Sequence, residues 1–379
     1  MTTLRASRTD EPRLTSLSPA AAMPGGEVEL RGTALQVGSA EPAAGAGGAG
    51  ASGSARSRGQ QQQPLALPHV TIGGTPANVA LSRRGRAVIR VPEGAITGDV
   101  SLARADGSHS NPLELRVAVP MAENLHPVGN PAVDADGTVY TTVSGSRGQS
   151  VPVSIFSIQR DFQMRPHVRD LLNATGLAFG PDGFLYASSR AEGTVYRISS
   201  GGAMSTYAEG MGIATGIAFD ADGNLYVGDR SGTIFKVGPQ RGSGSGGERE
   251  IFVYATLEPS IAAYHLAFDA EGVLYVTGPT TSSNQAIWAI DRGGQTSVFY
   301  RGLGRAQGLA FDNDGNLYVA ASLEGQRGMV RITPGREASL VVSGNNLVGL
   351  AFLEDGCAAL ATRDALYHVC LDIEGAKLF

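Results

Sequence analysis

One sequence segment recurs along the last two thirds of the chain. It reads GLAFDNDGNLYVA in one copy and GIAFDADGNLYVG in another, and its aligned alanines fall at residues 132, 178, 218, 267, 310 and 351. Successive copies are therefore about 44 residues apart, which is the length of one four-stranded blade of a β-propeller. Because a single blade cannot bury both of its faces, six copies predict a closed ring of six blades over residues 120–379.

Each unit is expected to contain the same hairpins. In the third copy, residues 216–220 and 224–227 are apolar strand segments, and residues 221–223 form the turn between them. The glycine that ends each turn supplies the positive φ of a bulged hairpin. The repeated phenylalanines and tyrosines are predicted to pack between neighbouring blades. Two ways of closing the ring are open, since either residues 375–379 or residues 121–128 can provide the last strand.

Residues 12–118 lack this repeat and show a different pattern. Short alternating strands separated by turn residues predict a small all-β sandwich. Residues 37–64 contain almost no large apolar side chain, so burial cannot offset the entropy of ordering them. The sequence therefore predicts a sandwich with a disordered insertion at 37–64, and an all-β chain overall.

Charge and composition exclude several classes of partner. The formal net charge is −5 and charged residues make up 17% of the chain, with no dense basic stripe, so nucleic acid is not an expected partner. No apolar run is long enough to span a membrane, and the first residues do not read as a signal peptide. Localisation is therefore left unknown.

Short motifs in the first third occur in a recognisable order: LSP at 17–19, GG at 25–26, LRG at 30–32, VTIGG at 70–74, IRVP at 89–92, GDV at 98–100 and SN at 110–111. This order resembles that of IPT/TIG immunoglobulin-like domains, over most of residues 12–118 outside the insertion. The resemblance implies a spacer or an interaction surface. Such modules often occur on exported proteins when they precede a propeller, so export is an implied expectation.

The repeat of residues 120–379 resembles the NHL-repeat and gluconolactonase (regucalcin-like) six-bladed propellers. The resemblance implies one divalent metal on the propeller axis, held by acidic and amide residues that precede the inner-strand glycine. The positions here are Gly129, Thr175, Thr215, Tyr264, Gln307 and Val348. None is a carboxylate, whereas calcium sites usually include several. The sequence therefore predicts no metal cofactor, with Ca²⁺ or another divalent metal as the alternative.

The Asp-x-Asp-Gly turns that begin at Asp134, Asp220 and Asp312 also suggest calcium loops. An EF-hand needs a further acidic or amide ligand before the glycine and a glutamate at the loop end, and both are absent. Because the motif recurs at one hairpin after another, turn formation explains it better.

A candidate ligand site can still be named. Asp229 and Arg230 follow an inner hairpin, and they are predicted to line one mouth of the axial tunnel together with five further residues, Thr175, Thr215, Tyr264, His265 and Gln307. The alternative is an exposed turn beside one packed histidine. No GxSxG elbow or other nucleophile is convincing, so catalytic residues are unknown.

The leading hypothesis is a non-catalytic protein that binds a protein, carbohydrate or small-molecule ligand at a propeller face and carries an immunoglobulin-like interaction domain. The main alternative is a metal-dependent sugar lactonase or related hydrolase, which the missing ligands oppose. A third is attachment to polysaccharide or a cell surface through the sandwich.

The two cysteines permit one geometric prediction. If Arg363 and Asp364 form a two-residue hairpin turn, Cys357 lies directly opposite Cys370 at a non-hydrogen-bonded pair. Their Cα atoms would then be about 4.5 Å apart, close enough for a disulfide in an oxidising compartment.

Overall fold

A computed structural model describes residues 11–36, 67–145, 149–240, 249–281 and 285–376. Within these ranges the chain is all β, with one short 3₁₀ turn, η1 (Glu354–Gly356). It divides into two compact units. The first contains Met1–Ser18 and Glu27–Leu115, and the second contains Pro19–Gly26 and Arg116–Phe379. Among the described residues, no helix is long and apolar enough to cross a membrane.

The first unit is a layered arrangement of antiparallel strands. Its strand order is β1-β3-β6-β5-β4-β7-β8. The strands are β1 (Arg13–Ser18), β3 (Glu27–Thr33), β4 (His69–Ile72), β5 (Thr75–Arg83), β6 (Arg86–Arg90), β7 (Gly98–Ala103) and β8 (Leu113–Val117). Strand β5 pairs with β4 through its first residues and with β6 through the rest, so it belongs to two sheets. Val28, Ile72, Ile89 and Leu102 are fully buried in this unit. The insertion expected at 37–64 lies outside the described residues.

Pro19–Gly26 groups with the second unit, although its place in the sequence lies inside the predicted sandwich. Its strand β2 (Ala21–Ala22) pairs in parallel with Val342 and Ser343 of β30 (Ala338–Ser343). The Met23 amide also donates to the Ser343 carbonyl at 2.7 Å. Ala21 and Met23 are buried in the same hydrophobic cluster as Tyr318.

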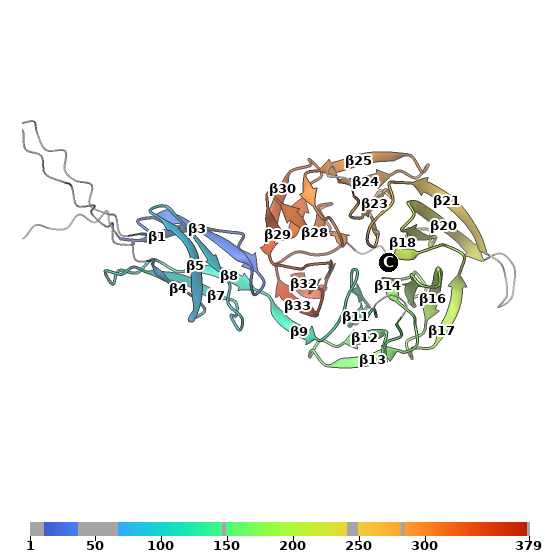
Figure 1. Ribbon diagram of the computed structural model, residues 1–379, viewed down its shortest axis with the longest axis horizontal. Helices are drawn as coiled ribbons and strands as arrows, with labels where there is room; N and C mark the ends of the chain where they lie inside the picture. Colours follow the sequence, from blue (N-terminus) through green and yellow to red (C-terminus); the bar gives the residue numbers. More distant parts are fainter. Residues whose placement is uncertain (1–10, 37–66, 146–148, 241–248, 282–284, 377–379) are drawn as a thin grey trace, which may run out of the picture. The chain divides into compact units, whose positions relative to one another are not determined.

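The second unit contains a β-propeller whose sheets lie around a common axis (Figure 1). Five four-stranded sheets stand separately. They are β10 (Ala132–Val133), β11 (Val139–Thr142), β12 (Ile155–Ile158), β13 (Met164–Val168); β14 (Ala174–Phe179), β15 (Leu185–Ser189), β16 (Thr194–Ile198), β17 (Met204–Ala208); β18 (Ala214–Phe219), β19 (Leu225–Asp229), β20 (Thr233–Gln240), β21 (Arg249–Thr256); β22 (His265–Phe268), β23 (Leu274–Thr277), β24 (Ala286–Ile290), β25 (Thr296–Arg301); and β31 (Gly349–Phe352), β32 (Cys357–Ala361), β33 (Ala365–Cys370), β9 (Val119–Glu123).

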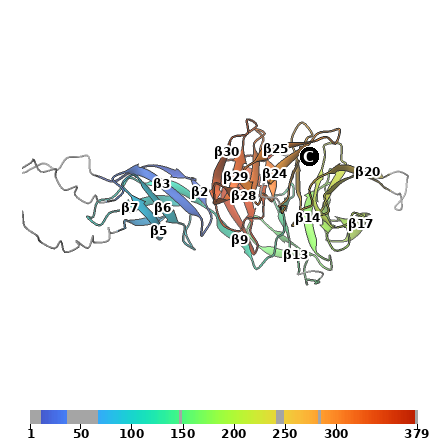
Figure 2. The ribbon, with the colours of Figure 1, turned by 45° about the horizontal axis from the view of Figure 1, so that its top comes forward.

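The expectation of six separate blades is therefore corrected to five. The remaining repeat forms β26 (Leu303–Gly304), β27 (Leu309–Phe311), β28 (Leu317–Leu323) and β29 (Gln326–Ile332), and β29 pairs with β30. Figure 2 shows β28, β29 and β30 side by side. Because β30 also pairs with β2, these strands belong to a larger sheet and do not stand alone.

Aromatic rings join successive repeats, which confirms the predicted packing role. Each repeat's tyrosine meets the phenylalanine of the next repeat edge to face, with ring centroids 4.7–5.5 Å apart, in the pairs Tyr140–Phe179, Tyr186–Phe219, Tyr226–Phe268, Tyr275–Phe311 and Tyr318–Phe352. Such pairs contribute roughly 0.5–1.5 kcal/mol each beyond their buried area. The repeat is therefore also the unit of inter-sheet stabilisation.

The ring closes through the strand that precedes the first repeat. Strand β9 pairs antiparallel with β33 and supplies the outer strand of the last sheet, in agreement with the alternative at 121–128, which β9 overlaps. In the other candidate segment Gly375 forms a bridge to Asp312, and residues 377–379 lie outside the described residues. At this closing interface Ala359 replaces the tyrosine, and aliphatic side chains such as Met121, Val139 and Leu366 form the buried cluster. Closure thus depends on aliphatic packing and on pairing of β9.

The predicted cysteine register is confirmed. Cys357 lies opposite Cys370 across β32 and β33, and the two form a disulfide with their Cα atoms 3.8 Å apart. The Thr362 amide donates to the Ala365 carbonyl at 2.8 Å, so Arg363 and Asp364 form the two-residue turn that sets this register.

Candidate functional site

The inner strands of the second unit enclose a cavity of about 800 Å³. Large apolar residues from five of the six repeats line its wall: Leu177, Phe179, Ile217, Phe219, Leu266, Phe268, Leu309, Phe311, Leu350 and Phe352. These are the alternating inner-strand residues around each repeat's alanine. The cavity is therefore a direct product of the repeat.

Glycines bring the inner strands close together at one level of the axis. A side chain on Gly176 would collide with the Thr215 carbonyl oxygen, and one on Gly216 would collide with that of Tyr264. Gly349 has the same relation to the carbonyl of Gly129. The repeat's glycine is thus needed because each inner strand lies against the backbone of another repeat.

Two repeats depart from glycine at this level, with Asn130 and His265. The Asn130 side chain donates to the Leu309 carbonyl at 2.8 Å and accepts from the Leu350 amide at 3.1 Å. It thereby ties the first repeat to the fifth and sixth. The His265 ring lies close to Gly129, which is three repeats away: a Cβ atom added to Gly129 would be 3.6 Å from His265 Cε1. The imidazole therefore spans the axis.

His265 is a neutral, buried base that lines the cavity. Its side chain is 5% exposed, and burial lowers the pKa of its imidazole to about 4. No described residue forms a hydrogen bond with its ring nitrogens. Because a neutral imidazole offers one donor and one acceptor, the cavity holds an unused pair of hydrogen-bonding atoms.

A second histidine, His167, also lines the cavity. Its ring packs against Tyr140 with centroids 4.9 Å apart, and burial lowers its pKa. Nothing in the repeat marks His167, since it lies on the outer strand β13.

The structure brings three of the seven residues expected at the tunnel mouth to the cavity, namely Thr175, Tyr264 and His265. Two of these use their polar atoms internally. Thr175 Oγ1 donates to the Asn173 carbonyl at 2.9 Å, and the Tyr264 hydroxyl donates to the Glu258 carbonyl. Only the His265 side chain of the three remains available to a ligand among the described residues.

The other four expected residues are absent from the cavity wall and have local roles. Thr215 Oγ1 donates to the Gly228 carbonyl at 2.7 Å. Asp229 is 5% exposed and accepts from the Ile213 amide at 2.9 Å. Arg230 Nη2 donates to the Ile261 carbonyl at 3.2 Å, and Gln307 Nε2 donates to the Leu347 carbonyl at 3.5 Å.

The donor set on the axis does not fit a hard divalent cation. Of the six positions before the repeat glycine none is a carboxylate, and the threonine and tyrosine hydroxyls there donate to backbone carbonyls. Carboxylates occur at the cavity edge, where Asp134 accepts from the Thr138 amide and the Tyr140 hydroxyl, and Glu354 pairs with Arg160 at 2.6 Å. Calcium would have to compete with these contacts for its oxygen ligands.

The Asp-x-Asp-Gly turns likewise use their first carboxylate internally. Asp220 accepts from the Asn224 amide at 2.8 Å and from the Tyr226 hydroxyl at 3.0 Å. Asp312 makes the same two contacts with Asn316 and Tyr318, at 2.8 and 3.0 Å. The turns therefore anchor the interblade tyrosines, as turn chemistry requires.

Comparison with known proteins supports the propeller fold. A model of the strictosidine synthase-like N-terminal family matches residues 216–237, and no curated protein matches the chain. A candidate gluconolactonase structure is 17% identical with a TM-score of 0.53, covering 69% of this chain and 93% of its own. An auxiliary nutrient binding protein from Bacteroides ovatus is 11% identical with a TM-score of 0.50, covering 95% and 98%.

The Staphylococcus aureus virginiamycin B lyase is also similar, at 14% identity and a TM-score of 0.45 over 77% of this chain and 92% of its own. At these identities the likeness concerns the fold alone. The described part of the chain is thus all β and contains a β-propeller, and its activity must be argued from its own residues.

Proposed function

We propose that the protein is a non-catalytic binding protein whose propeller takes a small, largely apolar ligand in the axial cavity. The observation that carries this proposal is the buried His265 imidazole, whose two nitrogens have no partner among the described residues although they lie in a cavity large enough for a ligand. Because His265 lines the cavity, a ligand bound there could form a hydrogen bond with its imidazole.

The cavity indicates the chemistry of the ligand. Its volume of about 800 Å³ lies within the range of small-molecule sites, and leucine, isoleucine and phenylalanine residues make up a substantial part of its wall. A fully charged ligand would lose hydration without gaining a counter-charge from His265, which is neutral. We therefore expect a neutral molecule with an apolar body and a hydroxyl, carbonyl or amide group that bonds to the imidazole.

The same residue opposes hydrolysis. A general base works best when its pKa lies near the working pH, whereas the pKa of His265 is about 4. No described serine, threonine or cysteine is hydrogen-bonded to its ring. Together with the absence of carboxylates at the six axial positions, these properties favour binding over the lactonase alternative. The nutrient binding protein of Bacteroides ovatus offers a precedent for binding on a similar fold.

Two structural proposals accompany this function. We infer that β27–β30 serve as a sixth blade, because they are antiparallel in the same order as the others and aromatic pairs flank them at Phe311 and Tyr318. We also propose that the first unit is an immunoglobulin-like module of the IPT/TIG type that contacts a protein or carbohydrate partner.

The test is a thermal-shift screen of the intact chain with neutral sugars, nucleosides, aromatic alcohols and lactones. We expect a subset to raise the Tm of wild type and to lose this effect in His265→Phe, which fills the cavity without hydrogen-bonding atoms. The exposed His69→Phe is the matched control and should behave as wild type. A panel with no His265-dependent shift, or lactone turnover abolished by chelator, would overturn the proposal.

A further inference from the structure

The last repeat keeps the backbone hydrogen bond of the inner hairpin turn, from the Leu353 amide to the Cys357 carbonyl, but lacks the side-chain hydrogen bonds that hold this turn in the fifth repeat. In the fifth repeat, Asp312 accepts from Asn316 and Tyr318, whereas the aligned residues of the last repeat are Leu353, Cys357 and Ala359. None of these three can reproduce the carboxylate–amide–hydroxyl contacts. A disulfide from Cys357 to Cys370 occupies this place, so the chemistry of the position has changed from hydrogen bonding to thiol chemistry.

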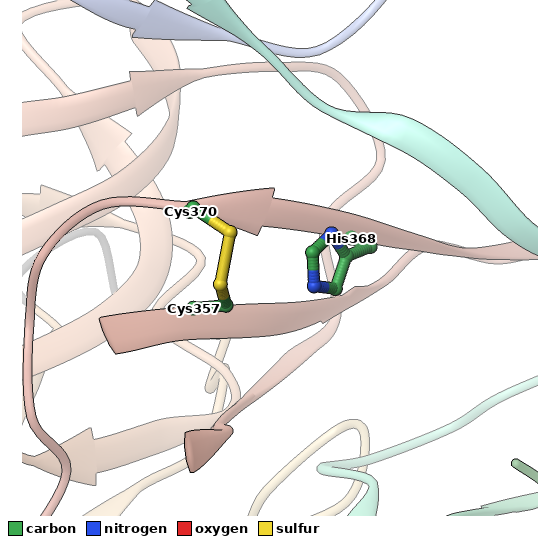
Figure 3. A group of neighbouring side chains, drawn as sticks. All are labelled: Cys357, His368 and Cys370. Atoms are coloured by element: carbon green, nitrogen blue, oxygen red, sulfur yellow. A yellow bond between two sulfur atoms is a disulfide. The ribbon is translucent and has the colours of Figure 1, made fainter. Parts of the chain in front are cut away.

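The strand register brings an imidazole to the same face as the disulfide. His368 and Cys370 are two residues apart on β33, so their side chains point to one face. His368 lies opposite Ala359, a buried residue whose small side chain stands where other repeats carry tyrosine. Figure 3 shows the imidazole beside the two sulfur atoms.

Among the described residues, these three side chains form the one group of at least three histidine, cysteine or acidic residues whose ligand atoms converge. Their ligand atoms all lie within 4.8 Å of one another. His368 is half-buried against Phe162, with ring centroids 5.4 Å apart, and no described residue forms a hydrogen bond with its nitrogens. Cys370 is exposed and Cys357 is buried, so the group opens to solvent on one side.

We propose that Cys357, Cys370 and His368 form a binding site for Zn²⁺ or a similar thiophilic cation when the disulfide is reduced. A dithiol reductant transfers two electrons to the S–S bond, which breaks to give two thiols while the reductant becomes a cyclic disulfide. The cation then binds both sulfurs and one imidazole nitrogen, and two thiol protons are released to solvent. The disulfide and the metal site are thus alternative states of one hairpin.

The ligand chemistry favours zinc over the hard cations considered for the axis. Two thiolates and an imidazole match the ligand types of zinc, and three protein ligands leave a fourth position for water. In a tetrahedral site with Zn–S bonds near 2.3 Å, the sulfurs lie about 3.8 Å apart, so both cysteine side chains must rotate away from the disulfide position.

The experiment uses the full chain in both redox states. Protein is reduced with dithiothreitol, freed of reductant under anaerobic conditions, and titrated with Co²⁺ as a spectroscopic substitute for Zn²⁺. We expect one equivalent to bind with thiolate-to-cobalt charge-transfer absorption, and Zn²⁺ to displace it. The oxidised protein should show no such absorption.

Variants separate a metal site from a structural disulfide. His368→Ala should weaken Co²⁺ binding by about tenfold or more, since changes even in outer-shell partners cost 10–100-fold. The exposed His69→Ala should not change it, and Cys370→Ser should abolish the charge-transfer band. Thermal unfolding provides a second measurement in case reduction destabilises the fold. Zn²⁺ should raise the Tm of the reduced wild type but not that of reduced His368→Ala.

Absence of Co²⁺ absorption in the reduced wild type, or equal affinity in His368→Ala, would overturn the proposal and leave the disulfide as a staple. Reduced protein that unfolds and is not rescued by Zn²⁺ would also overturn it. The outcome is independent of the axial cavity, because none of the three residues lines that cavity.

Discussion

Mild acid should destabilise the second unit through His265. The pKa of its imidazole is about 4 in the folded protein, against an ordinary value near 6.5 in an unfolded chain. Between these values the unfolded state binds more protons than the folded state, so stability is full above pH 6.5 and is lost as the pH falls toward 4. Integrating this difference gives a loss of about 2 kcal/mol at pH 5 and about 3 kcal/mol at pH 4.

Urea unfolding followed by tryptophan fluorescence measures this effect. The chain has one tryptophan, Trp288 in β24, so the signal reports on the second unit. Other groups titrate in the same range, including His167 and His368, whose pKa values burial also lowers. Subtracting the pH dependence of His265→Asn from that of wild type therefore isolates the contribution of His265.

The variant should lose about 2 kcal/mol less than wild type between pH 7 and pH 5, whatever its stability at pH 7. His69→Asn, at an exposed position of the first unit, should keep the wild-type pH dependence. Equal pH dependence of wild type and His265→Asn would refute the reasoning, because it would mean that the imidazole is not held neutral by burial.

Three further changes test the packing. Tyr226→Phe keeps the ring pair with Phe268 but loses the hydrogen bond to Asp220, so it should lower the free energy of unfolding in urea by about 1 kcal/mol. Tyr226→Ala also loses the ring and should lower it by about 3–5 kcal/mol. Equal losses in the two variants would contradict the role of the ring. Reduction of Cys357–Cys370, which are 13 residues apart, should lower unfolding free energy in metal-free buffer by about 3 kcal/mol, and an unchanged urea midpoint would contradict this. Gly216→Ala should lower Tm markedly, because the new methyl group would collide with the Tyr264 carbonyl oxygen. Gly201→Ala should leave Tm nearly unchanged, because the nearest atom to its methyl group would lie 3.9 Å away. Similar losses of Tm in the two variants would argue against the close approach of the inner strands.

Periodicity made much of the propeller predictable from sequence. The alignment showed that Tyr226 and Phe268 belong to two series of aromatic residues, each at the same position of successive repeats. Large apolar rings that recur in this way were predicted to be buried between neighbouring sheets. The cysteine pairing was predictable because a two-residue turn determines every pair along a hairpin. The count of separate sheets was not, since Ala21 and Ala22 carry no strand pattern and pair with β30 through backbone atoms that any residue has.

The candidate site was predictable only in part. Alignment identifies which positions face the axis, and Asn130 and His265 stand out because each replaces a glycine there. Alignment cannot show where a side chain's hydrogen bonds go. Thr175 and Tyr264 face the cavity but bond to backbone carbonyls, and His167 reaches it from an outer strand.

The chain leaves the second unit after Gly26 and returns at Arg116, where β2 and β8 run in parallel with Ala21 beside Arg116. The first unit therefore consists of two segments, Met1–Ser18 and Glu27–Leu115, which flank Pro19–Gly26 of the second unit in the sequence. Removing both Met1–Ser18 and Glu27–Leu115, and joining Gly26 to Arg116 with a short linker, should therefore yield a self-sufficient propeller. A plain truncation before Ala118 would instead remove the alanines that pair with the outer edge of β30.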